Sequence, residues 1–218
     1  GNDDSLVTET VIGRKWRAWT DAGNPEKIYP SFTGSMVDPE TYPPLPKHVK
    51  SSIWENVAKT ADEHNKPGVF TALIGYEWTS MIARNNLHRV VVYKDSADKA
   101  SQMNPFSAQD SLDPRDLWAA LEKYENSTGG EALAIPHNSN LSGGMMWPDV
   151  TIDGYPINRE YAKQSARWEP IAEVTQVKGD SETHPRLSPN DEFADFETFI
   201  LSLLLTISAK NLDLHQDS

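Results

Sequence analysis

The alternation of apolar and polar residues predicts two neighbouring β-strands joined by a polar loop. An apolar run, Val69–Gly75, leads to the carboxylate of Glu77. After the loop, His88 precedes a second run, Arg89–Tyr93, which is rich in β-branched residues. Both runs have the composition of strands. If they pair as an antiparallel hairpin, the end of the first lies beside the start of the second. We therefore expect Glu77 and His88 to lie close together.

Helical spacing precedes this hairpin. The segment Ser51–Asn65 has apolar residues on one face, and Ser52 and Glu55 have the spacing of a capping box. The sequence Lys66-Pro67-Gly68 ends the helix before the first strand begins. The residues expected on the apolar face are Ile53, Val57 and Ala61, with Trp54 beside them.

A second helix and a third strand follow the hairpin. Asp113 and Pro114 form a strong helix start, with Asp as the N-cap and Pro at the first helical position. The helix ends at Gly129-Gly130, and Glu131–Pro136 then reads as a short apolar strand that leads into His137. This succession of helix, turn and strand is typical of an α/β protein.

The remaining segments are less regular. Prolines interrupt residues 1–50, where Ile12–Thr20 is compatible with either a short helix or a strand. We expect a helix over Asn158–Trp168 and a fourth strand over Ile171–Val177. The apolar stretch Phe199–Ile207 fits a helix or a strand, and it is far shorter than the ~20 residues that span a bilayer.

Composition narrows the function classes. The chain has 218 residues and a net charge of −12 without any basic stripe, which argues against binding to a nucleic-acid backbone. It has no cysteine, so disulfides, thiolate zinc sites and a cysteine nucleophile are excluded. No signal peptide is visible, which leaves the compartment open. We expect a soluble protein, periplasmic or secreted if a signal peptide has been removed.

Polar residues at strand ends suggest a metal site. Glu77 and His137 each follow an apolar run, and the hairpin brings His88 to the same edge. A carboxylate with two imidazoles suits a divalent ion such as zinc, manganese or iron, and such a site generates hydroxide at neutral pH. Each residue alone also has an ordinary structural explanation, and no HxH or HExxH spacing is present among these three. Phosphate-binding loops and a GxSxG elbow are absent from the sequence.

Four long motifs carry a resemblance to a known family. They are GYEWTS, NLHRVVVY, AIPHNSNLSGG and EVTQVKGDSETHPRLSPNDEFADFE. Over about Ser51 to Phe199 the chain resembles an uncharacterised bacterial family of unknown function that we place within the PHP (polymerase and histidinol phosphatase) superfamily. The resemblance implies a partial or distorted (β/α)7 barrel of the α/β class, a cluster of metal ions and phosphoesterase activity.

The resemblance also implies roles for individual residues. Glu77 matches the glutamate of a middle strand, and His88 and His137 match two later histidines, so all three are expected metal ligands. The expected domains are an irregular segment 1–50, a PHP-like domain 51–199 and an atypical tail 200–218. The residues expected to contact a small-molecule or phosphate-ester substrate are Asn138, Lys178, Glu182 and His184.

The chain also departs from the PHP pattern. Residues 1–50 carry no HxH pair, and Asp213-Leu214-His215 has a DxH form in unfamiliar surroundings. Two hypotheses follow. The first is a metal-dependent hydrolase of phosphoesterase type. The second is a catalytically inactive PHP-like domain with a binding or assembly role, whose exposed sheet edges favour a homo-oligomer.

Overall fold

A computed structural model describes residues 8, 10–28, 30–31, 46–176, 179–180, 185, 189–192 and 194. Lys178, Glu182 and His184 lie outside these residues, as do Phe199–Ile207 and the Asp213–His215 triplet. The helices are α2 (Val11–Asp21), η1 (Pro25–Lys27), α4 (Lys47–His64), α5 (Ala97–Ala100), α6 (Pro114–Thr128), η2 (Ser139–Leu141) and α7 (Arg159–Trp168). The strands are β1 (Ile74–Trp78), β2 (Met81–Ile82), β3 (Asn85–Asn86), β4 (Arg89–Tyr93), β5 (Ala132–Pro136), β6 (Thr175–Gln176) and β7 (Gly179–Asp180).

A three-stranded sheet with the order β1–β4–β5 lies at the centre of the fold. Strand β4 is antiparallel to both neighbours, so β1 and β5 run parallel to each other on either side of it. The C-terminal ends of β1 and β5 therefore lie at the same edge as the start of β4. The expected antiparallel pairing of the first two runs is confirmed, with Trp78 opposite Arg89.

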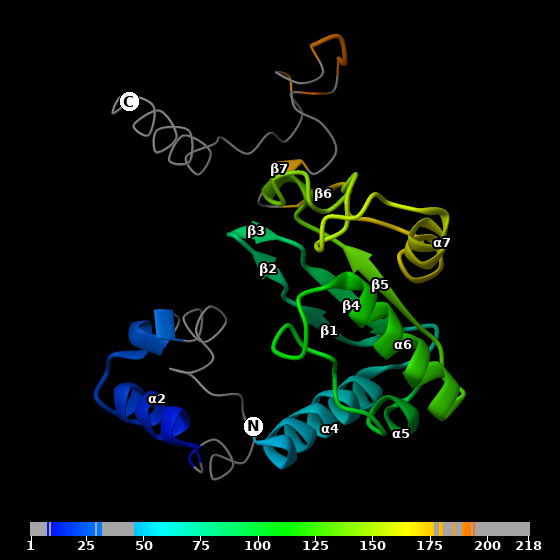
Figure 1. Cartoon of the computed structure of the whole chain (residues 1–218). Coiled ribbons are helices and arrows are strands. Elements are labelled where there is room, and N and C mark those ends of the chain that lie inside the picture. Colours follow the sequence, from blue (N-terminus) through cyan, green and yellow to red (C-terminus); the bar gives the residue numbers. More distant parts are fainter. Residues whose placement is uncertain are drawn as a thin grey trace, which may run out of the picture.

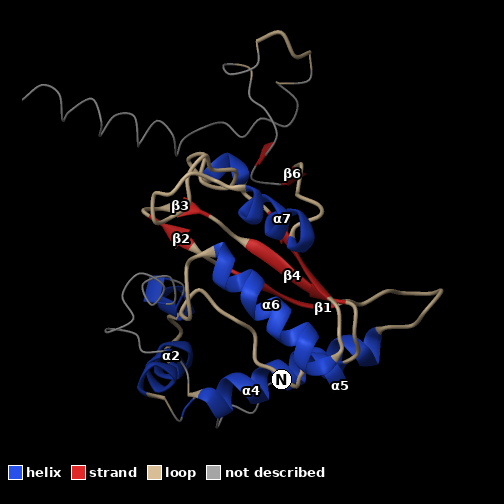
Figure 2. Ribbon diagram, turned by 45° about the vertical axis from the view of Figure 1, so that its right-hand side comes forward, coloured by secondary structure: helices blue, strands red, loops and turns tan. Residues whose placement is uncertain are grey.

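Helices pack on one face of this sheet. Figure 2 shows α6 in front of the strands, and in Figure 1 α4 runs below them. Aromatic rings pack between the helices and the sheet. The ring centroid of Tyr93 in β4 lies 5.6 Å from that of Trp54 in α4 and 4.8 Å from that of Tyr124 in α6. Residues that alternate with these along the strands, such as Val90, point to the opposite and more exposed face.

The expectation of a (β/α)7 barrel is wrong. The described strands form one antiparallel sheet of three strands and two separate pairs, β2–β3 and β6–β7, without closing into a barrel. The architecture is mixed α/β. A parallel barrel requires each strand to pair with a parallel neighbour, whereas β4 enters the sheet in the opposite direction to β1 and β5.

The first strand begins later than the apolar pattern predicts. The segment Lys66–Phe70 forms a tight turn in which the two end residues exchange backbone hydrogen bonds of 2.8 and 2.9 Å. Gly68 has φ of +81° inside this turn, a value that favours glycine. The pairing with β4 then starts at Ile74, opposite Tyr93. The strand consequently extends through Glu77 instead of ending before it.

Helix α4 also differs from its prediction. It begins at Lys47 after Pro46, so Ser52 lies inside the helix and does not cap it. The buried residues of the helix are Val49, Trp54 and Ala58, while Val57, which we expected on the apolar face, is exposed. No helix in the described part of the chain is long and apolar enough to cross a membrane.

Of the elements predicted after β4, the two helices are confirmed and the last strand is not. Helix α6 has Asp113 as its N-cap, which accepts a hydrogen bond from the Arg115 backbone, and it ends at Gly129 in a left-handed conformation. The helix predicted over Asn158–Trp168 is confirmed as α7, with Asn158 as its N-cap. The predicted strand Ile171–Val177 is wrong over most of its described length, because only the pair in β6 is extended in a ladder.

Candidate metal centre

Three strand ends bring Glu77, His88 and His137 together. Glu77 lies near the end of β1, His88 immediately precedes β4, and His137 immediately follows β5. The backbone N–H of His137 donates to the His88 carbonyl over 3.1 Å, which extends the β4–β5 pairing by one step. Strand alternation directs all three side chains away from the helices. The sheet register therefore assembles the group that we predicted at this edge.

A single carboxylate oxygen lies at the centre of the group. Glu77 Oε1 is 3.0 Å from Nδ1 of His88 and 3.0 Å from Nε2 of His137. The two imidazole rings meet edge to face, with centroids 5.7 Å apart. Each residue offers one ligand atom, and these three atoms lie within 4.8 Å of one another.

Burial is uneven across the group. The side chains of the two histidines are about one-tenth exposed, whereas that of Glu77 is 46% exposed. Hydrogen bonding to His137, and next to His88, holds the pKa of the Glu77 carboxyl well below its ordinary value, although partial burial acts in the opposite direction. The centre is thus an ionised carboxylate that faces solvent on one side and two imidazoles on the other.

The ring nitrogen of His137 that faces away from Glu77 also affects how this residue can bind a metal. His137 Nδ1 lies 3.4 Å from the carbonyl oxygen of Ile135, which can only accept a hydrogen bond. When a metal ion takes the place of the proton between Nε2 and Glu77, that contact lets Nδ1 keep its own proton and leaves the lone pair of Nε2 for the ion. Histidines that bind metals commonly donate their other N–H to a backbone carbonyl in this way.

The lone pair of His137 and the Glu77 carboxylate repel each other unless a positive charge lies between them. A proton can supply that charge, and so can a metal cation. Zinc–nitrogen bonds of about 2.0–2.1 Å place tetrahedral ligand atoms about 3.4 Å apart. The 3.0 Å separations in the group therefore need only a small outward movement to accept an ion. The donor set fits zinc, manganese or iron.

A buried ion pair, which the sequence reasoning did not find, fixes β4 beside the centre. Arg89 Nε lies 3.0 Å from Glu169 Oε1, and both side chains are 1% exposed. The indole N–H of Trp118 donates to the same oxygen over 2.8 Å, and Arg89 Nη1 donates to the Leu87 carbonyl over 2.6 Å. Because Arg89 and His88 point to opposite faces, this pair anchors the strand on the helix side while His88 reaches the metal centre.

The predicted substrate-contacting residues have different placements. Asn138 is fully buried, with φ of +67°, and its Nδ2 lies 3.4 Å from His88 Nδ1. The structure therefore places it behind His88. The expected contacts from Lys178, Glu182 and His184 fall outside the described residues and stay predictions.

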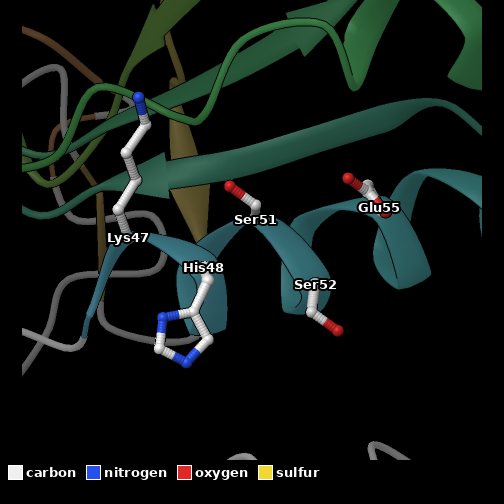
Figure 3. A pocket seen from close by; sticks show the side chains of 5 residues that line it. All are labelled: Lys47, His48, Ser51, Ser52 and Glu55. Carbon is white, nitrogen blue, oxygen red and sulfur yellow. The ribbon is translucent and has the colours of Figure 1, made fainter.

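A surface hollow lies away from this group. It is formed by the first turns of α4, where the side chains of Lys47 and His48 point in different directions (Figure 3). Its lining does not include Glu77, His88 or His137. The residues that line it are Lys47, His48, Ser51, Ser52 and Glu55.

Comparison with known families shows to which family the chain belongs. Residues 7–216 match the family described as "Protein of unknown function (DUF3604)", and the chain belongs to that family. No curated protein and no solved structure matches the chain. The match gives no indication of the PHP superfamily. Our assignment to a PHP branch is therefore wrong, and the metal centre has to be argued from its own geometry.

Proposed function

We propose that the protein binds a divalent metal ion through Glu77, His88 and His137 and acts as a metal-dependent hydrolase. The convergence of three ligand atoms from three separate strand ends carries the proposal. Histidine and carboxylate ligands in this number are found in catalytic zinc sites, where three protein ligands leave a position open. When bound, the metal supplies a Lewis acid and a water molecule that ionises near neutral pH.

The chain's own residues have distinct parts in this proposal. The two imidazoles, which are largely buried, hold the ion from the protein side. Glu77, which is 46% exposed, leaves the centre accessible to a small-molecule substrate. Phosphate esters head the substrates to be tested, because a metal cation stabilises the charge that develops on a phosphoryl group.

Metal analysis of the whole chain tests the first part of the proposal. Zinc, manganese and iron(II) are titrated in turn by calorimetry, and the metal content of dialysed protein is measured. We expect about one ion per chain in the wild type and a loss of binding of at least ~100-fold in His137→Ala. His64→Ala is the matched control, because this exposed histidine lies at the end of α4, where its Nδ1 is 2.9 Å from the Thr60 carbonyl oxygen. Equal binding by all three proteins would contradict the proposed site.

An activity panel tests the second part. The metal-loaded protein is assayed with phosphate monoesters, phosphate diesters and carboxylic esters. Hydrolysis that disappears in Glu77→Gln and in His137→Ala, but survives in His64→Ala, would support a hydrolase. Turnover that is unaffected by the loss of either ligand would rule the centre out as the active site.

A non-catalytic binding role is a second candidate. Exposed apolar side chains precede and line β1 and β4: Val69 is 85% exposed, Leu73 63% and Val90 37%. Large exposed apolar side chains contribute to interaction surfaces where they gather on one face. Sedimentation of the wild type and of Leu73→Ser is the test. A concentration-dependent dimer in the wild type, weakened in the variant, would favour assembly, and a strict monomer would argue against it.

A further inference from the structure

We infer that Arg84, at the tip of the β2–β3 hairpin, is a specificity-determining residue that binds the phosphoryl oxygens of a substrate held at the metal centre. The inference rests on the proposed hydrolase and names the anionic class of substrate that it would select. Three observations carry it: the place of the hairpin, the lack of a partner for Arg84 among the described residues, and the backbone conformation of the turn.

The β2–β3 hairpin extends from the edge of the sheet that carries the metal centre. The backbone N–H of Leu87 donates to the Ser80 carbonyl over 2.9 Å, which closes the base of the hairpin between Glu77 and His88. The pairing then continues through β2 and β3, beyond the end of β1 (Figure 1). Arg84 lies four residues before His88, a span of at most about 14 Å along the chain. Its side chain and a phosphate ester at the centre can together cover that distance.

The hairpin is also fixed to the loop that follows His137. Asn85 Nδ2 donates to the Ala83 carbonyl over 3.4 Å, so the Asn85 amide supports the turn from within. On its other side, the Asn85 amide oxygen lies against the backbone of Gly143, where a Cβ atom would collide with it. The position of the turn is therefore set relative to the His137 loop as well as to β4.

The guanidinium of Arg84 is available to bind an anion. The side chain is exposed and has no hydrogen bond or ion pair with any residue in the described part of the chain. Arg17, Arg115 and Arg167, by contrast, each pair with a carboxylate. The planar fork of a guanidinium matches the oxygens of a phosphate group. Its positive charge would also offset the repulsion that the ionised Glu77 exerts on an anionic substrate.

The backbone of the turn suits glycine better than it suits arginine. Ala83 has φ of +48° and Arg84 φ of +68°, as a two-residue turn of type I′ requires. Such turns favour Asn-Gly, because most side chains clash with the backbone in the left-handed region. Residues held in this region against their preference cluster at ligand-binding sites. An arginine at a position that suits glycine indicates a role for its side chain outside the turn.

The variant Arg84→Gly separates binding from folding, because glycine adopts the left-handed conformation without strain. The probe is phenylphosphonate, a phosphate-ester analogue with a carbon–phosphorus bond that is not hydrolysed. Its affinity for the zinc-loaded full chain is measured by calorimetry, and the melting temperature is recorded alongside. We expect Arg84→Gly to bind at least ~10-fold more weakly, as fits the loss of charge-assisted hydrogen bonds, with a melting temperature equal to or above that of the wild type.

Arg17→Gln is the matched control. Arg17 is an exposed arginine of α2 that already pairs with Asp21, so its loss should leave the affinity for phenylphosphonate unchanged. A second measurement follows the side-chain Nε–H resonance of Arg84 by nuclear magnetic resonance while phenylphosphonate is added to the metal-free and to the zinc-loaded chain.

The outcomes separate this inference from the proposed function. A shift of the Arg84 resonance in the metal-free chain would support the inference even if the chain binds no zinc and the proposed hydrolase fails. Equal affinities of Arg84→Gly and the wild type for phenylphosphonate would overturn the inference even if zinc binds. An Arg84 resonance that moves in neither form of the chain would overturn it as well.

Discussion

At the scale of single residues, the Glu77 side chain is much more exposed than the two histidines that it contacts. Its Oε1 contacts both imidazoles, while nearly half of the side chain faces solvent. A carboxylate buried as deeply as the histidines would cost far more to ionise. Partial exposure keeps the group charged and lets a metal and a substrate reach it. The histidines, which bind a metal in their neutral form, can be buried at a much smaller cost.

The metal-free protein should lose stability in acid because of Glu77. Its pKa in the folded state lies below the ordinary value of 4.5, so its contribution is present above that value and is lost as the pH falls through the folded pKa. The contribution is at most about 1 kcal/mol, because solvent screens a half-exposed group. Urea unfolding between about pH 2 and 6 should show a shallower pH dependence in Glu77→Gln than in the wild type.

Glu131→Gln is the control for that measurement, because Glu131 is an exposed carboxylate that pairs with Lys94 far from the metal centre. Its pH dependence should match the wild type. A Glu77→Gln curve parallel to the wild-type curve would show that the imidazoles do not stabilise this carboxylate.

At the scale of elements, the close approach of β1 and β4 positions the ligands. Gly75 lies opposite Val92, and a Cβ atom at Gly75 would stand 2.6 Å from the Val91 carbonyl oxygen. The backbone of β4 cannot move away without disturbing its other neighbour, β5. Glycine at this position therefore allows the register of β1 and β4. That register brings Glu77, two residues after Gly75 in β1, close to His88.

Gly75→Ala should separate β1 from β4 and weaken both the fold and the metal centre. We expect a loss of about 1–3 kcal/mol in the free energy of unfolding, as is typical when atoms are inserted into a packed site. Zinc affinity should fall by at least ~10-fold. Urea unfolding and zinc calorimetry measure the two effects. Val92→Ala, which removes atoms at the paired position without a clash, should leave zinc affinity unchanged, and equal losses in both variants would contradict the argument.

The predictable elements carried local signals. The start of α6 was foreseen from Asp113-Pro114 and its end from Gly129, and β4 was foreseen from its β-branched residues. Glu77 and His88 could be brought together because a hairpin relates residues close in sequence. The beginning of α4 at Lys47 and the late start of β1 lack such signals, since packing against the sheet and pairing with β4 decide them.

The unpredictable features depend on contacts between distant segments. The ion pair of Arg89 with Glu169 joins residues 80 apart, and Gln176 Nε2 donates a hydrogen bond to Asn138 Oδ1, 38 residues away. Neither pair has a spacing or a motif. The barrel was expected from a resemblance and not from the pattern of strands, and the direction of β4 within the sheet overturns it.

At the scale of the whole molecule, the Arg89–Glu169 pair connects the sheet to the chain that follows α7. Both side chains are 1% exposed, and the pair is completed by the Trp118 indole of α6. Removing one member leaves the other charge buried without its partner. The pair therefore ties β4, the strand that directly follows His88, to both α6 and the end of α7.

Glu169→Ala should be among the most destabilising substitutions in the described chain. We expect a loss of about 3–5 kcal/mol in the free energy of unfolding. The matched control is Glu131→Ala, whose partner Lys94 is exposed, and which should cost no more than about 1 kcal/mol. Thermal and urea unfolding provide the comparison. Similar losses for the two variants would show that the buried pair contributes no more than a surface pair.

Metal removal should also be visible in the stability of the whole chain. An ion that binds only the folded state adds about 2.7 kcal/mol to the free energy of unfolding at a concentration 100 times its Kd. The melting temperature should accordingly rise with zinc and return to its metal-free value with a chelator. His137→Ala should show no zinc-dependent rise, whereas His64→Ala should behave as the wild type does.

The order β1–β4–β5 also has a consequence for folding kinetics. The β1–β4 hairpin closes a short loop, whereas β5 reaches β4 only after the chain has passed through α6, which is a slower, non-local step. Glu77 and His88 can meet before that step, but His137 cannot join them until it has taken place. Tight binding by all three ligands would thus be possible only after β5 has paired with β4. Zinc would therefore slow unfolding much more than it would accelerate refolding.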